Sequence, residues 1–196
     1  MKSQNKRQQA AAGLLITGLQ QRLLSSIEAF ARTLGVHKKT VHRQWDSGKK
    51  SATPTPSVSA NTLDLLSDSI DSDDDRANLS EEDLQAEEDA QFEAASAASA
   101  VSAGDIDAET QWQAEQKLLE KMTTIANSAR GQADARVRKL FEWIDANMCS
   151  GMLDKSGSAK PAWNDTRLLI FTEYEDTKRY LVQQLQAAIA KTDQAS

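Results

Sequence analysis

The sequence predicts a mostly α-helical chain that carries one or two strands of an α/β fold and a disordered acidic linker. Three observations lead to this prediction. Apolar residues recur every three or four positions over most of the chain, one short continuous apolar run stands at 168–171, and periodicity disappears over 47–78. The 196 residues suffice for one domain or for two partial ones. Aromatic residues make up only 5%, which argues against a large aromatic core.

The first two helices are predicted in the basic N-terminal part of the chain. A helix is expected from about residue 8 to 34, because its apolar residues fall on one stripe: Leu15, Leu19, Leu23, Ile27, Phe30 and Leu34. Gly35 is expected to end this helix, and residues 38–46 are expected to form a further short one. His37 and His42 are then exposed groups on a basic helix.

An acidic insertion is predicted at 47–107, with a flexible linker over 47–78 rich in Ser, Thr, Pro and acidic residues. Ser80 followed by Asp83 is typical of a helix start. The Ala and Ser residues after Glu93 are poor core formers, so this helix is expected to be exposed.

Two more helices are predicted at 108–129 and 133–148. The apolar residues of the first are Trp112, Leu119, Met122, Ile125 and Ala129. Those of the second are Val137, Leu140, Phe141, Ile144 and Met148. A Gly, Ser and Pro loop is expected to follow. Trp143 and Trp163 are interpreted as packing residues.

The apolar run from Leu168 to Phe171 suits a strand buried on both faces, as in a parallel sheet. It leads directly into a helix whose stripe holds Tyr180, Leu181, Leu185, Ala188 and Ile189. Strand followed by helix is half of a doubly wound α/β unit, and the other parallel strands are not in this chain. A lone strand cannot satisfy its own backbone groups, so the chain is expected to need a partner and to be poorly stable alone.

Charge is distributed in three blocks. Residues 1–50 hold ten Lys and Arg against two acidic residues, net +8. Residues 51–110 hold one Arg against sixteen acidic residues, net −15, and residues 111–196 hold twelve against eleven, net +1. The blocks predict a basic face, an acidic tether and a near-neutral folded part. The basic block could meet nucleic-acid phosphates, although charge alone favours a solvated helix face.

Several classes of protein are excluded by composition. Cys149 is the only cysteine, so neither a disulfide within the chain nor a cysteine-based zinc site can form. Two histidines so close in sequence do not indicate a metal centre. The N-terminal residues lack the apolar core of a signal peptide, and no apolar run reaches the length of a membrane span. We therefore expect a cytoplasmic protein with no membrane partner.

The stretch "RLLIFTEYEDTKRYLVQQL", Arg167 to Leu185, resembles motif IV of bacterial Swi/Snf-type helicase-like ATPases of superfamily two. The matching positions are Phe171, Thr172, Tyr174, Asp176, Thr177, Tyr180 and Leu181. In that family the motif opens the second RecA-like lobe. The preceding "DARVRKLFEWID", Asp134 to Asp145, resembles the helix that leads into this lobe. "LQQRLLSSIEAFARTLGVHK", Leu19 to Lys38, is similar to the helix that ends the first lobe.

The resemblance covers three blocks in the family's order across nearly the whole chain. It implies an α/β family fold of partial RecA-like P-loop lobes. Residues 1–46 would be the helical end of the first lobe, 47–107 the insertion between lobes, and 108–196 the incomplete start of the second lobe.

The ATP-hydrolysing motifs of the family are missing from this chain. It has no Walker A loop, no Asp-Glu-x-His and no arginine-finger motif. The resemblance therefore implies a central fragment of an ATP-dependent DNA helicase or translocase. ATP and Mg²⁺ would be bound by the intact enzyme, and this chain alone would hold no cofactor and be inactive. Its implied partners are the remaining helicase lobes and, through the intact enzyme, DNA.

The resemblance places nucleic-acid contacts where the strand meets the last helix, with the backbone N–H groups near Asp176 as further candidates. The side chains concerned are Thr172, Thr177, Lys178 and Arg179. Asp176 or Thr177 could instead cap the helix.

Residues 29–45 carry an alternative, a helix–turn–helix regulator with Gly35 in the turn and Val41 buried. The residues facing DNA would then be Lys38, Lys39, Thr40, His42 and Arg43. Gln44 stands where an apolar residue is expected, and no third packing element follows Trp45. A non-enzymatic helical adaptor with an acidic tail is a further alternative, but it leaves the buried strand unexplained.

Overall fold

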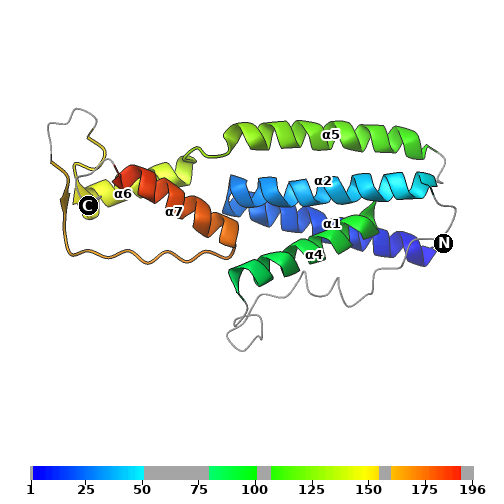
Figure 1. Ribbon diagram of the computed structural model, residues 1–196, viewed down its shortest axis with the longest axis horizontal. Helices are drawn as coiled ribbons and strands as arrows, with labels where there is room; N and C mark the ends of the chain where they lie inside the picture. Colours follow the sequence, from blue (N-terminus) through cyan, green and yellow to red (C-terminus); the bar gives the residue numbers. More distant parts are fainter. Residues whose placement is uncertain (1, 51–79, 101–106, 155–159, 191–196) are drawn as a thin grey trace. The chain divides into compact units, whose positions relative to one another are not determined.

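The computed structural model describes residues 2–50, 80–100, 107–154 and 160–190. In order, these form α1 (Lys2–Ser25), α2 (Ile27–Lys50), α4 (Glu81–Ser99), α5 (Ala108–Ala129), α6 (Ala135–Asn147), β1 (Cys149–Ser150), β2 (Ala162–Trp163) and α7 (Glu175–Ile189) (Figure 1). The prediction of a mostly helical chain is confirmed. The chain divides into two compact units, Met1–Ser128 and Ala129–Ser196. Residues 51–78 of the predicted linker lie outside the described residues.

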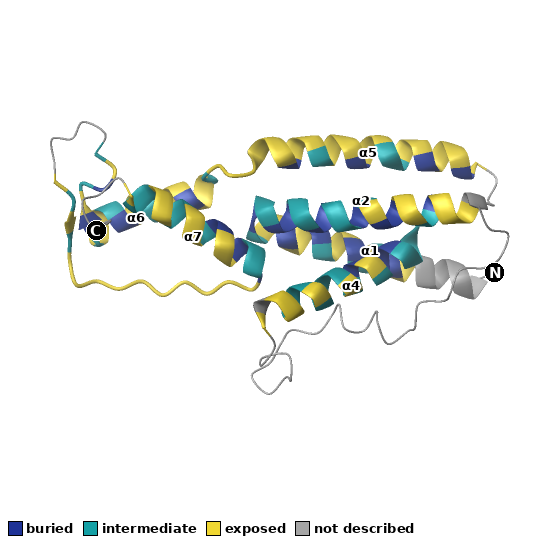
Figure 2. Ribbon diagram, in the orientation of Figure 1, coloured by how far each residue is buried: buried dark blue, intermediate teal, exposed yellow. Residues whose placement is uncertain are grey.

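The first unit is built around α1, α2 and α4, which all pack against one another. Their buried side chains form one core with two residues of α5: Leu15, Leu19, Phe30, Leu34, Phe92, Leu119 and Ala126 (Figure 2). A second cluster joins α2 to the start of α5 through Val41, Trp45, Ala108 and Trp112. The rings of Trp45 and Trp112 stack with centroids 4.8 Å apart, which fixes this end of α5 against α2.

The predicted helix end at Gly35 is wrong. The break between the first two helices lies at Ser26, and α2 runs without interruption through Gly35 to Lys50. Ser26 is fully buried, and its side-chain oxygen accepts a hydrogen bond from the backbone N–H of Ala29 at 3.1 Å, which caps α2. A helical glycine costs only about 1 kcal/mol, so the buried stripe of α2 outweighs it. The turn that a helix–turn–helix requires is therefore absent at this glycine.

The structure confirms the predicted start of α4, because the Ser80 side chain accepts a hydrogen bond from the Asp83 N–H at 3.2 Å. The expectation that this helix is exposed is wrong. Phe92 is 4% exposed, and Ala95 and Ser96 are completely buried. Small side chains let two helix backbones approach closely, so the Ala and Ser positions form a contact face rather than a solvent face.

Gly18 of α1 makes room for the ring of Phe92. A Cβ atom at Gly18 would lie 2.7 Å from the Phe92 Cζ atom, whereas a Cβ at Gly13 would meet nothing within 4 Å. We expect Gly13→Ala to raise the free energy of unfolding of the first unit by about 0.5–1 kcal/mol. Gly18→Ala should lower it by about 1–2 kcal/mol, because overpacking outweighs the same gain in helix propensity. Urea unfolding of both variants measures the difference, and equal effects at the two glycines would contradict the close approach.

The second unit is built from α6, the β1–β2 hairpin and α7. The side chain of Asp134 caps α6 by accepting from the Val137 N–H at 2.9 Å. The antiparallel hairpin pairs Cys149 with Trp163, within the segment expected to be a loop. The core of the second unit consists of Ile144, Cys149 and Met152. Partly buried apolar residues pack against them: Leu140, Phe141, Met148, Trp163 and Leu185. Four apolar positions predicted for the 133–148 helix thus contribute to this core.

Tyr180 ties α7 to the turn before α6. Its hydroxyl donates to the Gln132 carbonyl at 2.8 Å and accepts from the Asp134 N–H at 3.0 Å, and the residue is 2% exposed. We expect Tyr180→Phe to cost the second unit about 1 kcal/mol, because two hydrogen bonds to partly buried backbone groups are lost with the hydroxyl. Hydrogen exchange by NMR measures this. The Asp134 amide should exchange faster, and unchanged protection would contradict the prediction.

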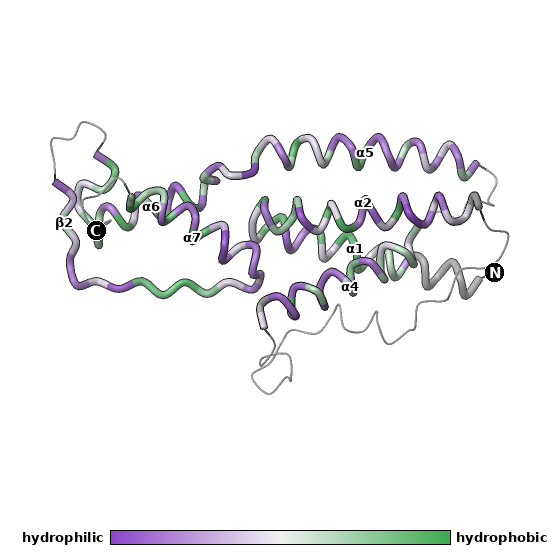
Figure 3. The backbone as a smooth tube through the Cα atoms, viewed as in Figure 1, coloured by the Kyte–Doolittle hydropathy of each residue, from purple (hydrophilic) through white to green (hydrophobic). Residues whose placement is uncertain are grey.

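Residues 168–171 do not form the predicted buried strand. Side-chain exposure alternates along the segment, at 38% for Leu168, 77% for Leu169, 39% for Ile170 and 86% for Phe171. Figure 1 shows an extended segment between β2 and α7, and Figure 3 shows that it is hydrophobic. An apolar run becomes a buried strand only where neighbouring strands cover it, and none of the described residues supplies such a strand.

Candidate functional site

The predicted nucleic-acid contacts lie at the start of α7 and immediately before it. Thr172 is exposed at the end of the extended segment, whereas Thr177 is 7% exposed. The backbone N–H groups of Thr177 and Lys178 donate to the Tyr174 carbonyl at 3.0 and 3.1 Å. This helix start therefore does not present those two N–H groups to an anion. The expected capping by Asp176 or Thr177 is wrong, because Tyr174 is the N-cap residue and makes no side-chain cap hydrogen bond.

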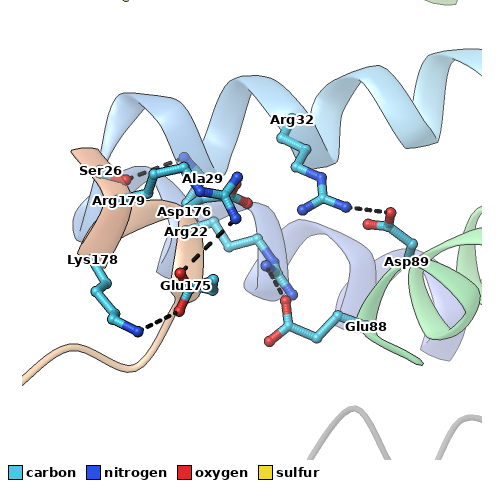
Figure 4. Close-up of polar contacts among 10 residues, drawn as sticks. All are labelled: Arg22, Ser26, Ala29, Arg32, Glu88, Asp89, Glu175, Asp176, Lys178 and Arg179. Carbon is cyan, nitrogen blue, oxygen red and sulfur yellow. Dashed lines mark hydrogen bonds and ion pairs between the residues drawn. The ribbon is translucent and has the colours of Figure 1, made fainter. Parts of the chain in front are cut away.

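The two basic side chains of this site are paired with acidic residues of the same helical turn. Lys178 Nζ lies 3.4 Å from a carboxylate oxygen of Glu175, and Arg179 lies 3.9 Å from Glu175 and 3.8 Å from Asp176 (Figure 4). The carboxylates interact favourably with the positive end of the α7 dipole. Lys178 and Arg179 are each about half exposed, so an external phosphate would compete with weak surface ion pairs.

The residues of the alternative DNA-binding prediction do not share one exposed face. Lys39 and His42 are exposed, but Thr40 is 1% exposed and its hydroxyl has no hydrogen-bond partner among the described residues. Lys38 forms an ion pair with Glu120 of α5, and Arg43 forms one with Glu93 of α4 at 3.1 Å. The geometry therefore gives this alternative little support.

The basic N-terminal helices and the acidic α4 neutralise each other within the first unit. Arg22 pairs with Glu88 at 2.9 Å, and Arg32 pairs with Asp89 at 2.6 Å (Figure 4). The Arg22 guanidinium also lies 4.8 Å from the centre of the Phe92 ring, a cation–π contact. The charge blocks predicted a basic face and a separate acidic tether. The described part of that tether is instead packed on the basic helices.

A buried histidine joins α2 to α4. His37 is 5% exposed, contrary to the expectation of an exposed side chain, and its Nδ1 shares a hydrogen bond with the Ser96 hydroxyl at 2.9 Å. Burial lowers the pKa of His37 to about 4, so the ring is neutral at pH 7. Sequence reasoning missed this residue, although its spacing of three from Leu34 and four from Val41 indicated the buried stripe.

The other reactive groups are arranged for packing rather than for chemistry. Burial raises the pKa of the Cys149 thiol, with a further contribution from Asp145, so the nucleophilic thiolate is disfavoured at neutral pH. No cluster of three or more His, Cys, Asp or Glu suited to a metal ion occurs in the part of the chain that the structure describes. Among the described helices, none has the length and apolar character needed to cross a membrane.

Comparison with known proteins gives no relative. No family model, no curated protein and no solved structure matches this chain.

Proposed function

We propose that this chain is the central segment of a bacterial Swi/Snf-type DNA helicase or translocase. Residues 108–196 would be the start of its second RecA-like lobe, and residues 1–46 the end of its first. ATP, Mg²⁺ and the hydrolysing residues would belong to the rest of the parent enzyme. The intact enzyme would couple ATP hydrolysis to movement along double-stranded DNA.

The observation that supports this proposal best is the exposed apolar segment before α7. Leu169 and Phe171 are 77% and 86% exposed. They belong to a continuous apolar run, which is typical of a strand in the centre of a sheet. Exposed apolar surface of this kind marks a site that another element covers. In the proposed parent, the parallel strands of the second lobe would cover it. The sequence resemblance names the same residues as the first strand of that lobe.

The proposal is tested by the coding sequence on both sides of this segment in its source. We expect a Walker A loop and an Asp-Glu-x-His upstream in frame, and an arginine-finger motif downstream. Stop codons on both sides, with no helicase motifs nearby, would overturn it.

The predicted DNA contacts are tested separately with the intact parent enzyme. We expect Lys178→Ala and Arg179→Ala each to weaken duplex binding and to reduce its salt dependence by about one counterion, because each removes a phosphate contact. Fluorescence anisotropy with a labelled duplex at several salt concentrations measures this. Lys139→Ala is the matched control, because Lys139 also forms an exposed i,i+3 ion pair, with Glu142 on α6. Equal losses in all three variants would contradict a specific contact.

A helical adaptor is the second candidate function, and one observation on α5 favours it. Leu118, Met122 and Ile125 recur at the spacing of a coiled-coil seam and are 62%, 36% and 58% exposed. Acidic residues of α4 already pair with arginines of this chain, so they do not supply the acidic tail of such an adaptor. A partner helix on α5 would suit an adaptor, whereas the exposed segment before α7 favours the helicase proposal.

A further inference from the structure

We propose that residues 167–173 form an antiparallel β-pair with the same residues of a second copy of this chain. The segment "RLLIFTE" would be the contact, and the dimer would be symmetric about Ile170. The proposal concerns the chain by itself and does not rest on the helicase proposal. A second copy would occupy the strand edge that the other strands of a lobe would otherwise take.

The backbone of this segment is available for pairing. The segment between β2 and α7 is extended (Figure 1), and the chain bends at Glu173 before α7 begins. Within the described part of the chain, no hydrogen bond is made by the backbone of residues 167–173. Proline and glycine are absent from the segment, so each residue keeps its N–H donor. An exposed, apolar and unpaired strand edge is a template for pairing with another chain.

The side chains of the segment complement themselves in one register. When two copies run antiparallel about Ile170, Arg167 of each copy stands opposite Glu173 of the other. Leu169 stands opposite Phe171, and Ile170 stands opposite Ile170 of the second copy. Leu169 and Phe171 are the two most exposed of the large hydrophobic residues among those described. This register therefore covers the two apolar side chains that are most accessible to solvent.

Charge selects the antiparallel arrangement over the parallel one. In a parallel, in-register pair, Arg167 would face Arg167 and Glu173 would face Glu173, and like charges directly opposite are unfavourable. In the antiparallel pair both ends carry an opposite-charge contact. The interface is then isologous, with the same patch used by both copies, and it closes after two chains.

The first test is the mass of the full chain in solution. We expect sedimentation equilibrium to show a concentration-dependent rise toward twice the mass of one chain. Ile170→Pro should keep the chain monomeric, because proline fixes φ at about −65° and so disrupts the extended backbone at the centre of the pair. A monomer at all concentrations up to several hundred micromolar would overturn the proposal, as would a dimer that Ile170→Pro leaves unchanged.

The second test is a charge exchange. Arg167→Glu alone and Glu173→Arg alone should each weaken dimerisation at least tenfold, because like charges then meet at both ends. An equimolar mixture of the two variants should restore dimerisation, because both ends of the mixed pair carry opposite charges again. A dimer that survives each single change uses another surface or a parallel register, and it would overturn the proposal.

The third test reads the register directly by a disulfide. With diamide as oxidant, Ile170→Cys should cross-link to its counterpart, because facing Cα atoms in an antiparallel pair are about 4.5–5.5 Å apart. Leu168→Cys is the control, because four residues of offset place it roughly 13 Å from its counterpart. Native Cys149 is completely buried and does not compete. Equal cross-linking at 168 and 170 would overturn the register.

Discussion

Phe92→Ala is expected to lower the free energy of unfolding of the first unit by about 3–5 kcal/mol. Phe92 is 4% exposed and belongs to the core that joins α1, α2 and α4. Its ring fills the space that Gly18 leaves open and lies under the Arg22 guanidinium. Alanine leaves a cavity at this junction and removes the cation–π contact. Urea unfolding measures the loss in the free energy of unfolding. Hydrogen exchange, read on the peptides that cover α1, α2 and α4, shows whether these three helices lose protection together.

Phe171→Ala is the matched control for this prediction. The same side chain is removed, but Phe171 is 86% exposed, so the stability of a monomeric chain should change by no more than about 0.5 kcal/mol. The control is measured at a concentration low enough to exclude association. A small effect at Phe92 would show that α4 is not part of the core. A large effect at Phe171 would show that the apolar segment is covered within one chain.

The helices that the sequence predicted well are those whose signals are local. The predicted bounds of α5 agree with the structure, although Met122, Ile125 and Ala129 of its predicted stripe are exposed. The Ser80 cap of α4 was recognised from two residues three positions apart. Gly35 misled because its local tendency to end a helix is outweighed by the buried stripe on both sides of it. Tertiary packing routinely overrides propensity of this size.

The charge pairs of the first unit were less accessible to sequence reasoning because their partners are far apart in sequence. Arg22 and Glu88 are separated by 66 positions, and Arg32 and Asp89 by 57. Which arginine meets which carboxylate depends on the register of α4 against α1 and α2. Composition gives the sign of each block but not that register. The Leu168–Phe171 run is the opposite case, because its local signal predicted a buried strand that the structure does not show. An apolar run is buried in a sheet only where neighbouring strands cover it, and the described residues supply none.

His37 is expected to make the stability of the first unit depend on pH. Its pKa is about 4 in the folded chain against an ordinary value of 6.5. Below pH 6.5 the unfolded chain gains a proton that the folded chain does not bind. Stability is therefore complete above pH 6.5 and falls as the pH decreases toward 4. Between pH 7 and pH 4.5 the loss should be about 2–3 kcal/mol, measured by urea unfolding at a series of pH values.

Two variants separate His37 from the carboxylates, which also titrate toward pH 4. His37→Gln keeps a polar group near Ser96 but cannot take up a proton, so its stability should fall less between pH 7 and pH 5.5, a range above the ordinary carboxylate pKa values. His42→Gln removes the exposed histidine at the edge of Trp112 and leaves His37 in place, so the loss of stability caused by His37 should remain. If His37→Gln and the unsubstituted chain lose stability in parallel over this range, protonation of His37 does not contribute to the pH dependence of stability. If only His37→Gln flattens the curve, protonation of His37 on unfolding causes the loss of stability at low pH.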